Sequence, residues 1–86
     1  MAWPAPLDEK RFAADRQVAN QVLLTWTISP NGVRNVDKQR LRTALVSLHV
    51  KLKRRPTTAS SVDYKAADDF LNGVARTVLG PRARLD

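Results

Sequence analysis

Apolar side chains recur with helical spacing in three segments of this 86-residue sequence. At about 100° per residue, each segment places its larger apolar residues on one face of a helix. The sets are Phe12, Ala19, Val22, Leu23 and Trp26, then Leu41, Ala44, Leu45, Leu48 and Leu52, and finally Ala67, Phe70, Leu71, Val74 and Val78. The pattern predicts an all-α fold, a small antiparallel three-helix bundle with short extended N- and C-terminal tails.

Prolines and acidic residues set the expected start of the first helix. Pro4 and Pro6 favour an extended tail over residues 1–6, and Asp8 suits a first helical turn. We therefore expect the first helix over about 7–27, starting near Leu7 or Asp8.

The end of the first helix is less clear than its start. Residues 25–28 (Thr-Trp-Thr-Ile) are β-prone and precede a Ser-Pro-Asn-Gly turn, a combination that also suits a hairpin. The helix is favoured because a hairpin would pair these residues only with residues 33–36, and an isolated two-stranded ribbon of that length is marginal.

The other two helices have recognisable limits. Asn35 is expected to cap a second helix over about 36–54, which must end before Pro56. Ser60 and Asp63 resemble a capping box for a third helix over about 62–79, with Gly80 suited to its left-handed cap. Residues 82–86 are then a frayed tail.

Length and composition indicate one domain over residues 1–86. Hydrophobic residues make up 43% of the chain and charged residues 27%, which is typical of a folded protein. So short a chain buries only about 60% of the surface it exposes when unfolded, so its stability is marginal. Self-association or binding to other protein subunits is therefore expected.

Several classes of function are disfavoured. The sequence has no cysteine and one histidine, His49, which is expected at the core boundary, so we predict no enzyme, no metal site and no cofactor or small-molecule substrate. Asp68 and Asp69 are adjacent on a helix and point about 100° apart, which favours ion pairing over acid-base catalysis. Short apolar runs and the lack of a signal peptide predict a cytoplasmic protein that does not bind membranes.

The net charge of +7 belongs to one segment. The net charge is zero over residues 1–33 and again over residues 56–86. Residues 34–55 hold eight basic residues and one acidic residue, Asp37. The bases are Arg34, Lys38, Arg40, Arg42, Lys51, Lys53, Arg54 and Arg55. The last four suit a helix C-terminus. The first four lie near the N-terminus, where the helix dipole destabilises each exposed cation by about 0.3–1 kcal/mol. Ion pairs with Asp15, Asp68 or Asp69 or an external polyanion would compensate that cost, and the polyanion is slightly favoured.

These bases lead to two functional hypotheses. The first is a non-enzymatic nucleic-acid-associated protein, DNA- or RNA-binding, that contacts the sugar-phosphate backbone through all eight bases without reading sequence, as a small subunit of a larger nucleoprotein complex. The alternative is a protein-interaction module, such as a phage-encoded inhibitor or a structural adaptor, that docks an acidic partner through the same face. Trp3, in the proline-flanked tail, and Val46 and Val50, outside the apolar stripe of the second helix, would then bind the partner.

Overall fold

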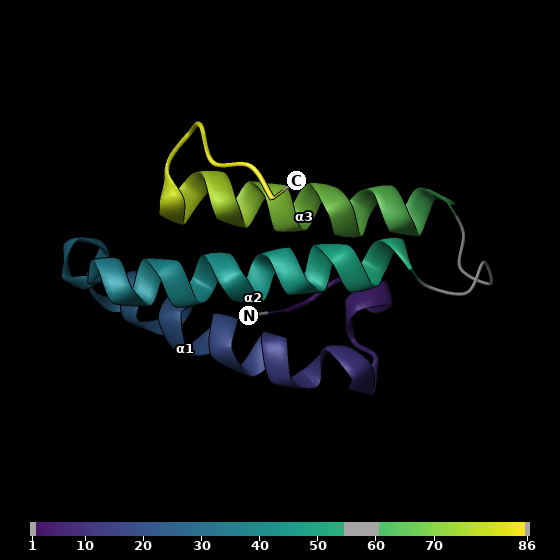
Figure 1. Cartoon of the computed structure of the whole chain (residues 1–86), viewed down its shortest axis with the longest axis horizontal. Helices are drawn as coiled ribbons and strands as arrows, with labels where there is room; N and C mark the ends of the chain where they lie inside the picture. Colours follow the sequence, from purple (N-terminus) through teal and green to yellow (C-terminus); the bar gives the residue numbers. More distant parts are fainter. Residues whose placement is uncertain (1, 55–60, 86) are drawn as a thin grey trace.

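Three α-helices, each antiparallel to the next along the chain, form the described part of the protein (Figure 1). The computed structural model describes residues 2–54 and 61–85. Of residues 61 and 62 it describes the backbone alone. The helices are α1 (Ala13–Ile28), α2 (Asn35–Lys53) and α3 (Ser61–Leu79). Because α2 lies between the other two and packs against both, the predicted all-α bundle is confirmed.

The leucine stripe of α2 is the centre of the core. Leu41, Leu45, Leu48 and Leu52 are each at most 1% exposed, and Ala44 is 4% exposed. From α1, the buried residues include Ala19, Val22 and Leu23, and from α3 Ala67, Leu71 and Val78. Ala75 of α3 is also fully buried, although the apolar pattern did not single it out.

The first helix begins later than expected. Residues before Ala13 form two short 3₁₀ turns, η1 (Ala5–Leu7) and η2 (Lys10–Phe12), separated by an extended residue, Glu9. The bend lets Leu7 reach the core, where it is fully buried. The Arg16 guanidinium holds the bend by donating hydrogen bonds to the carbonyl oxygens of Leu7 (2.6 Å) and Glu9 (2.7 Å).

The residues before η1 fold back over the bundle. Trp3 packs against Phe70 of α3 with ring centroids 5.2 Å apart, and its indole N–H donates to Oδ1 of Asn20 in α1 at 3.1 Å. Trp3 therefore links α1 to α3, the two outer helices. Trp3 was predicted to bind a partner under the alternative hypothesis, whereas the structure packs its ring against its own chain.

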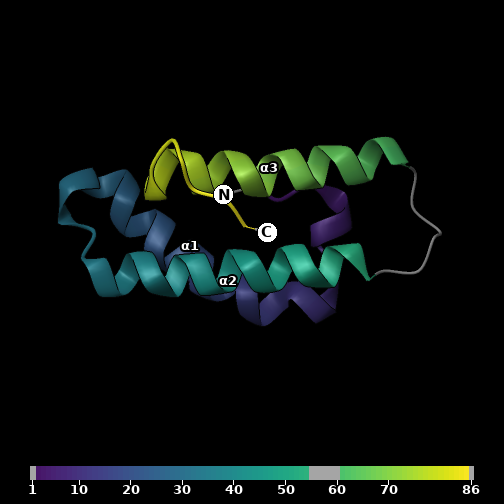
Figure 2. The same cartoon turned by 45° about the horizontal axis from the view of Figure 1, so that its top comes forward.

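The C-terminal residues also return to the bundle. Gly80, with φ of +126°, reverses the chain after α3, as expected for a left-handed cap. The following residues run back along α3 and end between α2 and α3 in the view of Figure 2. Leu85 is only 4% exposed and belongs to the core, so the expectation of a frayed tail is wrong there. An apolar residue five positions beyond the glycine has enough chain length to reach the core.

The β-prone end of α1 is helical, and its two threonine hydroxyls form hydrogen bonds within the helix. The hydroxyls of Thr25 and Thr27 donate to the carbonyl oxygens of Gln21 and Leu23, one turn earlier. The helix ends at Ile28, and η3 (Pro30–Gly32) makes the turn to α2. Arg34, not Asn35, occupies the N-cap position of α2, without a side-chain cap; Asn35 is the first helical residue.

We predict that Trp3→Ala lowers the free energy of unfolding by about 1–2 kcal/mol, because a half-buried aromatic contact between two helices is lost. Trp3→Phe, which keeps a ring but no N–H donor, should lose less than about 1 kcal/mol. Urea denaturation followed by far-ultraviolet circular dichroism measures both. Equal stability of Trp3→Ala and the unmodified chain would show that the tail does not pack as described.

A second prediction concerns Gly73, inside α3. A Cβ added there meets no atom within 4 Å, so no described neighbour requires glycine. Gly73→Ala should therefore stabilise the fold by about 0.5–1 kcal/mol through helix propensity. Gly80→Ala is the contrast, since its positive φ makes it destabilising. Thermal unfolding of both variants checks the two opposite signs.

Candidate nucleic-acid interface

The antiparallel arrangement gathers basic residues from two helices at one end of the bundle. The C-terminus of α1, the N-terminal half of α2 and the C-terminus of α3 all lie on the left of Figure 1. We call this region the cationic end, and define it by the six bases Arg34, Lys38, Arg40, Arg42, Arg76 and Arg82. The sequence holds one acidic residue between positions 16 and 62, Asp37, and none between 70 and 85, so this end has a large positive excess.

One aspartate serves two of these arginines. Asp37 accepts a hydrogen bond from Nε of Arg34 at 3.3 Å, and its other carboxylate oxygen lies 3.7 Å from Nη1 of Arg40. Arg40 also contacts Oε1 of Gln21 in α1, at 3.4 Å. Ion pairs with Asp15, Asp68 or Asp69 were one of the two compensations considered for these arginines, but the three aspartates pair instead with Lys51, His49 and Lys65.

The remaining four cations of this end have no partner among the described residues. Neither a hydrogen bond nor an ion pair joins Lys38, Arg42, Arg76 or Arg82 to any residue that the structure describes. Arg42, Arg76 and Arg82 are exposed, and Lys38 is half-buried. Their positive charge is therefore available to a ligand.

The helix termini offset part of the electrostatic cost at this end. The cations of α2 lie at its positively polarised N-terminus, which is unfavourable. The negatively polarised C-termini of α1 and α3 lie at the same end because both helices run antiparallel to α2. Neighbouring dipoles thus account for some of the clustering without any ligand.

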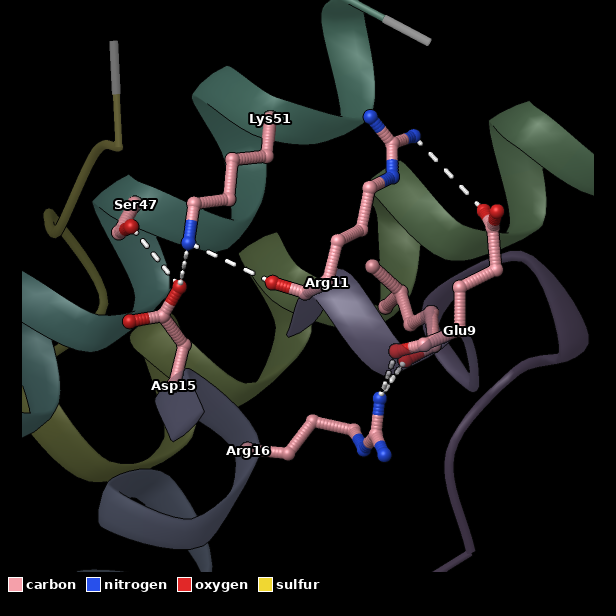
Figure 3. A network of polar contacts seen from close by, with 7 residues as sticks. Glu9, Arg11, Asp15, Arg16, Ser47 and Lys51 are labelled. Carbon is pink, nitrogen blue, oxygen red and sulfur yellow. Dashed lines mark hydrogen bonds and ion pairs between the residues drawn. The ribbon is translucent and has the colours of Figure 1, made fainter. Parts of the chain in front are cut away.

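Toward the opposite end of α2, Ser47 and Lys51 contact α1 (Figure 3). Asp15 of α1 accepts hydrogen bonds from Nζ of Lys51 at 3.0 Å and from the Ser47 hydroxyl at 2.8 Å. Lys51 also lies 3.5 Å from the carbonyl oxygen of Arg11, and Arg11 itself pairs with Glu9 at 3.7 Å. Lys51 therefore helps to fasten α1 to α2.

The eight bases predicted from the sequence do not form one surface. Arg40 and Lys51 contact α1, whereas Arg42 and Lys53 lie on the side of α2 that carries His49, which contacts α3. Lys53 and Arg54 are exposed and have no partner among the described residues, but they lie at the far end from Lys38. Arg55 lies outside the described residues.

His49 is more buried than its position on the apolar pattern indicated. It is 5% exposed, and its Nε2 lies 2.8 Å from Oδ1 of Asp68 in α3. Asp69 points elsewhere and pairs with Lys65 at 3.5 Å, so the two aspartates act as separate ion-pair partners. This His49–Asp68 contact joins α2 to α3.

The valines proposed for partner binding differ in exposure. Val46 is half-buried and packs against the core, while Val50 is 40% exposed. Val46 therefore presents less free surface than its place outside the main stripe predicted.

Among the described residues, no three His, Asp or Glu side chains are placed to share a metal ion. No helix in that part of the chain is both long and apolar enough to cross a membrane.

Sequence reasoning missed Arg76 and Arg82 as members of the site. Residues 56–86 are neutral as a segment, but Asp63, Asp68 and Asp69 lie in the first half of α3 and the two arginines lie at or beyond its last turn. The net charge of each half of each helix, considered together with the antiparallel topology, would have identified them.

Comparisons with family models, curated proteins and solved structures give no match for this chain. The fold and the charge distribution are therefore the basis for any proposal about its function.

Proposed function

We propose that the protein is a non-enzymatic nucleic-acid-associated subunit that binds the sugar-phosphate backbone through its cationic end. The observation that carries the proposal is the set of four cations at that end with no described internal partner: Lys38, Arg42, Arg76 and Arg82. Phosphates are the natural counterions for such a cluster, because each contact releases a condensed cation from the polymer.

Arginine content favours phosphate over isolated carboxylates as the ligand. Three of the four unpaired cations are arginines, whose planar guanidinium groups bind phosphate oxygens in a bidentate manner. They come from α2, from α3 and from the turn that follows α3, so they are not confined to a single helical stripe. Such a surface neutralises a backbone and carries no donor pattern for one base sequence.

Assembly into a larger complex is the second part of the proposal. A chain of 86 residues has a small core, and nucleoprotein complexes commonly supply the additional burial that such a chain lacks. The cationic end would face the polymer and other surfaces would face protein subunits. We place Lys53 and Arg54 in a secondary role, since they lie at the opposite end of α2.

The alternative partner is an acidic protein that docks on the same cations. Trp3 gives this alternative little support, because its ring packs on Phe70 and its N–H is bonded to Asn20. Poly-glutamate serves as the discriminating probe. It offers carboxylates at high density without phosphates, so tighter binding to it than to an oligonucleotide of equal charge would favour the protein partner.

We predict that the unmodified chain binds unrelated duplex oligonucleotides with affinity that falls steeply as salt rises. If the four unpaired cations each contact one phosphate, the slope of log K against log salt is about −3 to −4. Arg42→Gln/Arg76→Gln should make that slope shallower by about 2 and weaken binding about tenfold at low salt. Fluorescence anisotropy at several salt concentrations measures both quantities.

Lys53→Gln/Arg54→Gln is the matched control, since it removes the same charge from the other end of α2. It should weaken binding by less than about threefold, through the smaller long-range field alone. Equal losses in the two double variants would mean that net charge, not the cationic end, governs binding. A flat salt response of the unmodified chain would exclude backbone binding altogether.

A gain of affinity is expected when the aspartate at the cationic end is neutralised. Asp37→Asn releases Arg34 and Arg40 from their carboxylate and should tighten oligonucleotide binding about three- to tenfold at low salt. Asp69→Asn changes the net charge equally but releases only Lys65, away from the site, and should have little effect. The same anisotropy titration compares them, and an unchanged affinity for Asp37→Asn would contradict the assignment.

A further inference from the structure

An open groove runs between α1 and α3, in the halves of these helices that lead to the cationic end. We call it the α1–α3 groove. Its volume is about 320 Å³, and its lining includes Leu23 and Trp26 from α1 and Phe70, Gly73, Val74 and Thr77 from α3. No charged side chain lines it, although the chain has a net charge of +7.

Aromatic rings gather on this face of the bundle. The sequence has two tryptophans, two phenylalanines and one tyrosine, and three of these residues, Trp3, Trp26 and Phe70, lie between α1 and α3. Phe70 contacts Trp3 and also lines the groove together with Trp26. Trp26 is half-buried, and its indole N–H donates no hydrogen bond to any residue that the structure describes. The fold therefore leaves part of an aromatic surface open.

The α3 wall of the groove is open and apolar. A Cβ added at Gly73 would meet no atom within 4 Å, so the glycine leaves space beside the rings. The hydroxyl of Thr77 donates to the carbonyl oxygen of Gly73 at 2.8 Å, so it is already bonded within its own helix. The groove thus offers ring faces and apolar carbon with few hydrogen-bonding groups. Such a lining suits a flat ring of low specificity.

A cation borders the groove on α3. Arg76 is three positions beyond Gly73 and adjacent in sequence to Thr77, so it neighbours the lining residues on the helix surface. It is exposed and has no partner among the described residues. Arg82 lies just beyond the end of the same helix. A ligand that places a ring in the groove and a phosphate at its edge would meet both kinds of surface.

We propose that the α1–α3 groove receives one unpaired base of a single-stranded nucleic acid, which stacks on Trp26 while its phosphates contact Arg76 and the rest of the cationic end. The inference rests on the proposed function and adds the single strand as the preferred substrate. Binding of single strands without sequence preference combines the same two features, a cationic surface for the backbone and aromatic rings for the bases. The scarcity of hydrogen-bonding groups makes the groove tolerant of any base.

Size and charge favour a base over other occupants. The groove is at the small end of the range for ligand sites, about 300–1,000 Å³, which suits one planar ring system. A partner helix would need an apolar stripe several turns long and would gain nothing from Arg76. In a duplex each base is paired and stacked, so it could enter the groove only after leaving the stack.

The first test compares two ligands that differ only in their bases. Fluorescence anisotropy measures the affinity of the unmodified chain for oligothymidylate and for an abasic strand with the same number of phosphates. Oligothymidylate should bind about tenfold more tightly, because stacking adds to the phosphate contacts. The ratio of the two affinities should stay constant as salt rises, since stacking releases no counterions.

The outcomes of this comparison separate the two proposals. Equal affinities for the two strands would overturn the base site and leave backbone binding by the cationic end intact. Absence of binding to either strand at low salt would overturn both.

Filling the groove tests its location. Gly73→Leu places a side chain in the open space and should weaken oligothymidylate binding about tenfold, while the affinity for the abasic strand changes less than about twofold. Gly73→Ala controls for the stiffer helix, and Ala66→Leu adds a leucine at an exposed position of α3 about two turns away. Both controls should keep most of the preference for oligothymidylate.

Two results with the filled groove would contradict the proposal. Undiminished oligothymidylate binding by Gly73→Leu would place the base elsewhere. An equal loss for the two strands would reflect a disturbed cationic end and not a blocked base site. Far-ultraviolet circular dichroism checks that each variant is folded.

Trp26 fluorescence gives a readout that does not depend on a groove variant. In a Trp3→Phe chain, Trp26 is the only tryptophan. Its emission should fall when oligothymidylate binds, because a stacked base quenches the indole, and should stay nearly constant when the abasic strand binds. Unchanged emission with oligothymidylate, at concentrations where anisotropy shows binding, would overturn stacking on Trp26.

Discussion

The rest of the structure depends on burying the leucine stripe of α2. Four leucines on one helix, each at most 1% exposed, need cover from more than one direction. The helices α1 and α3 cover the stripe from two sides, and the chain's two ends fill what remains through Leu7 and Leu85. In so short a chain, residues outside the helices are part of the core because three helices bury too little surface alone.

The polar contacts fasten the elements that this burial brings together. Lys51 and Ser47 of α2 meet Asp15 of α1, and His49 of α2 meets Asp68 of α3. Arg16 secures the bend that delivers Leu7 to the core. These contacts lie mostly toward the end of the bundle that holds most of the acidic residues, although Lys53 and Arg54 at that end have no partner among the described residues. The other end keeps its positive charge because its single acid, Asp37, is shared by two arginines.

The cationic end, which is proposed to act in recognition, is electrostatic in character. It would attract a polyanion over a distance of about one Debye length, and this attraction would weaken as the salt concentration rises.

Much of the fold follows from the sequence itself. Periodic apolar residues gave the three helices and nearly all of the core they bury, because side chains separated by three or four positions share a face. Glycine and proline marked the ends of α3 and of α2. The helical state of residues 25–28 was favoured for a sound reason, namely that no partner strand of useful length follows them.

The local signals were less reliable where a distant contact decided the outcome. The start of α1 depends on Arg16 reaching back to two carbonyl oxygens, and the order of the C-terminal tail depends on the burial of Leu85. Likewise, His49 is buried because Asp68 on another helix supplies its partner. Patterns among residues that are close in the sequence do not reveal these contacts, because the partners are distant along the chain.

The sequence by itself determined that the excess charge is positive and that half of α2 carries unfavourably placed cations. Only the tertiary structure decided which cations belong together. Reversing the chain twice places the C-terminus of α3 beside the N-terminus of α2, so Arg76 and Arg82 join Lys38 and Arg42 while Lys51 is bound by Asp15. Charges interact through space, and antiparallel helices bring together the residues that the order of the chain keeps furthest apart.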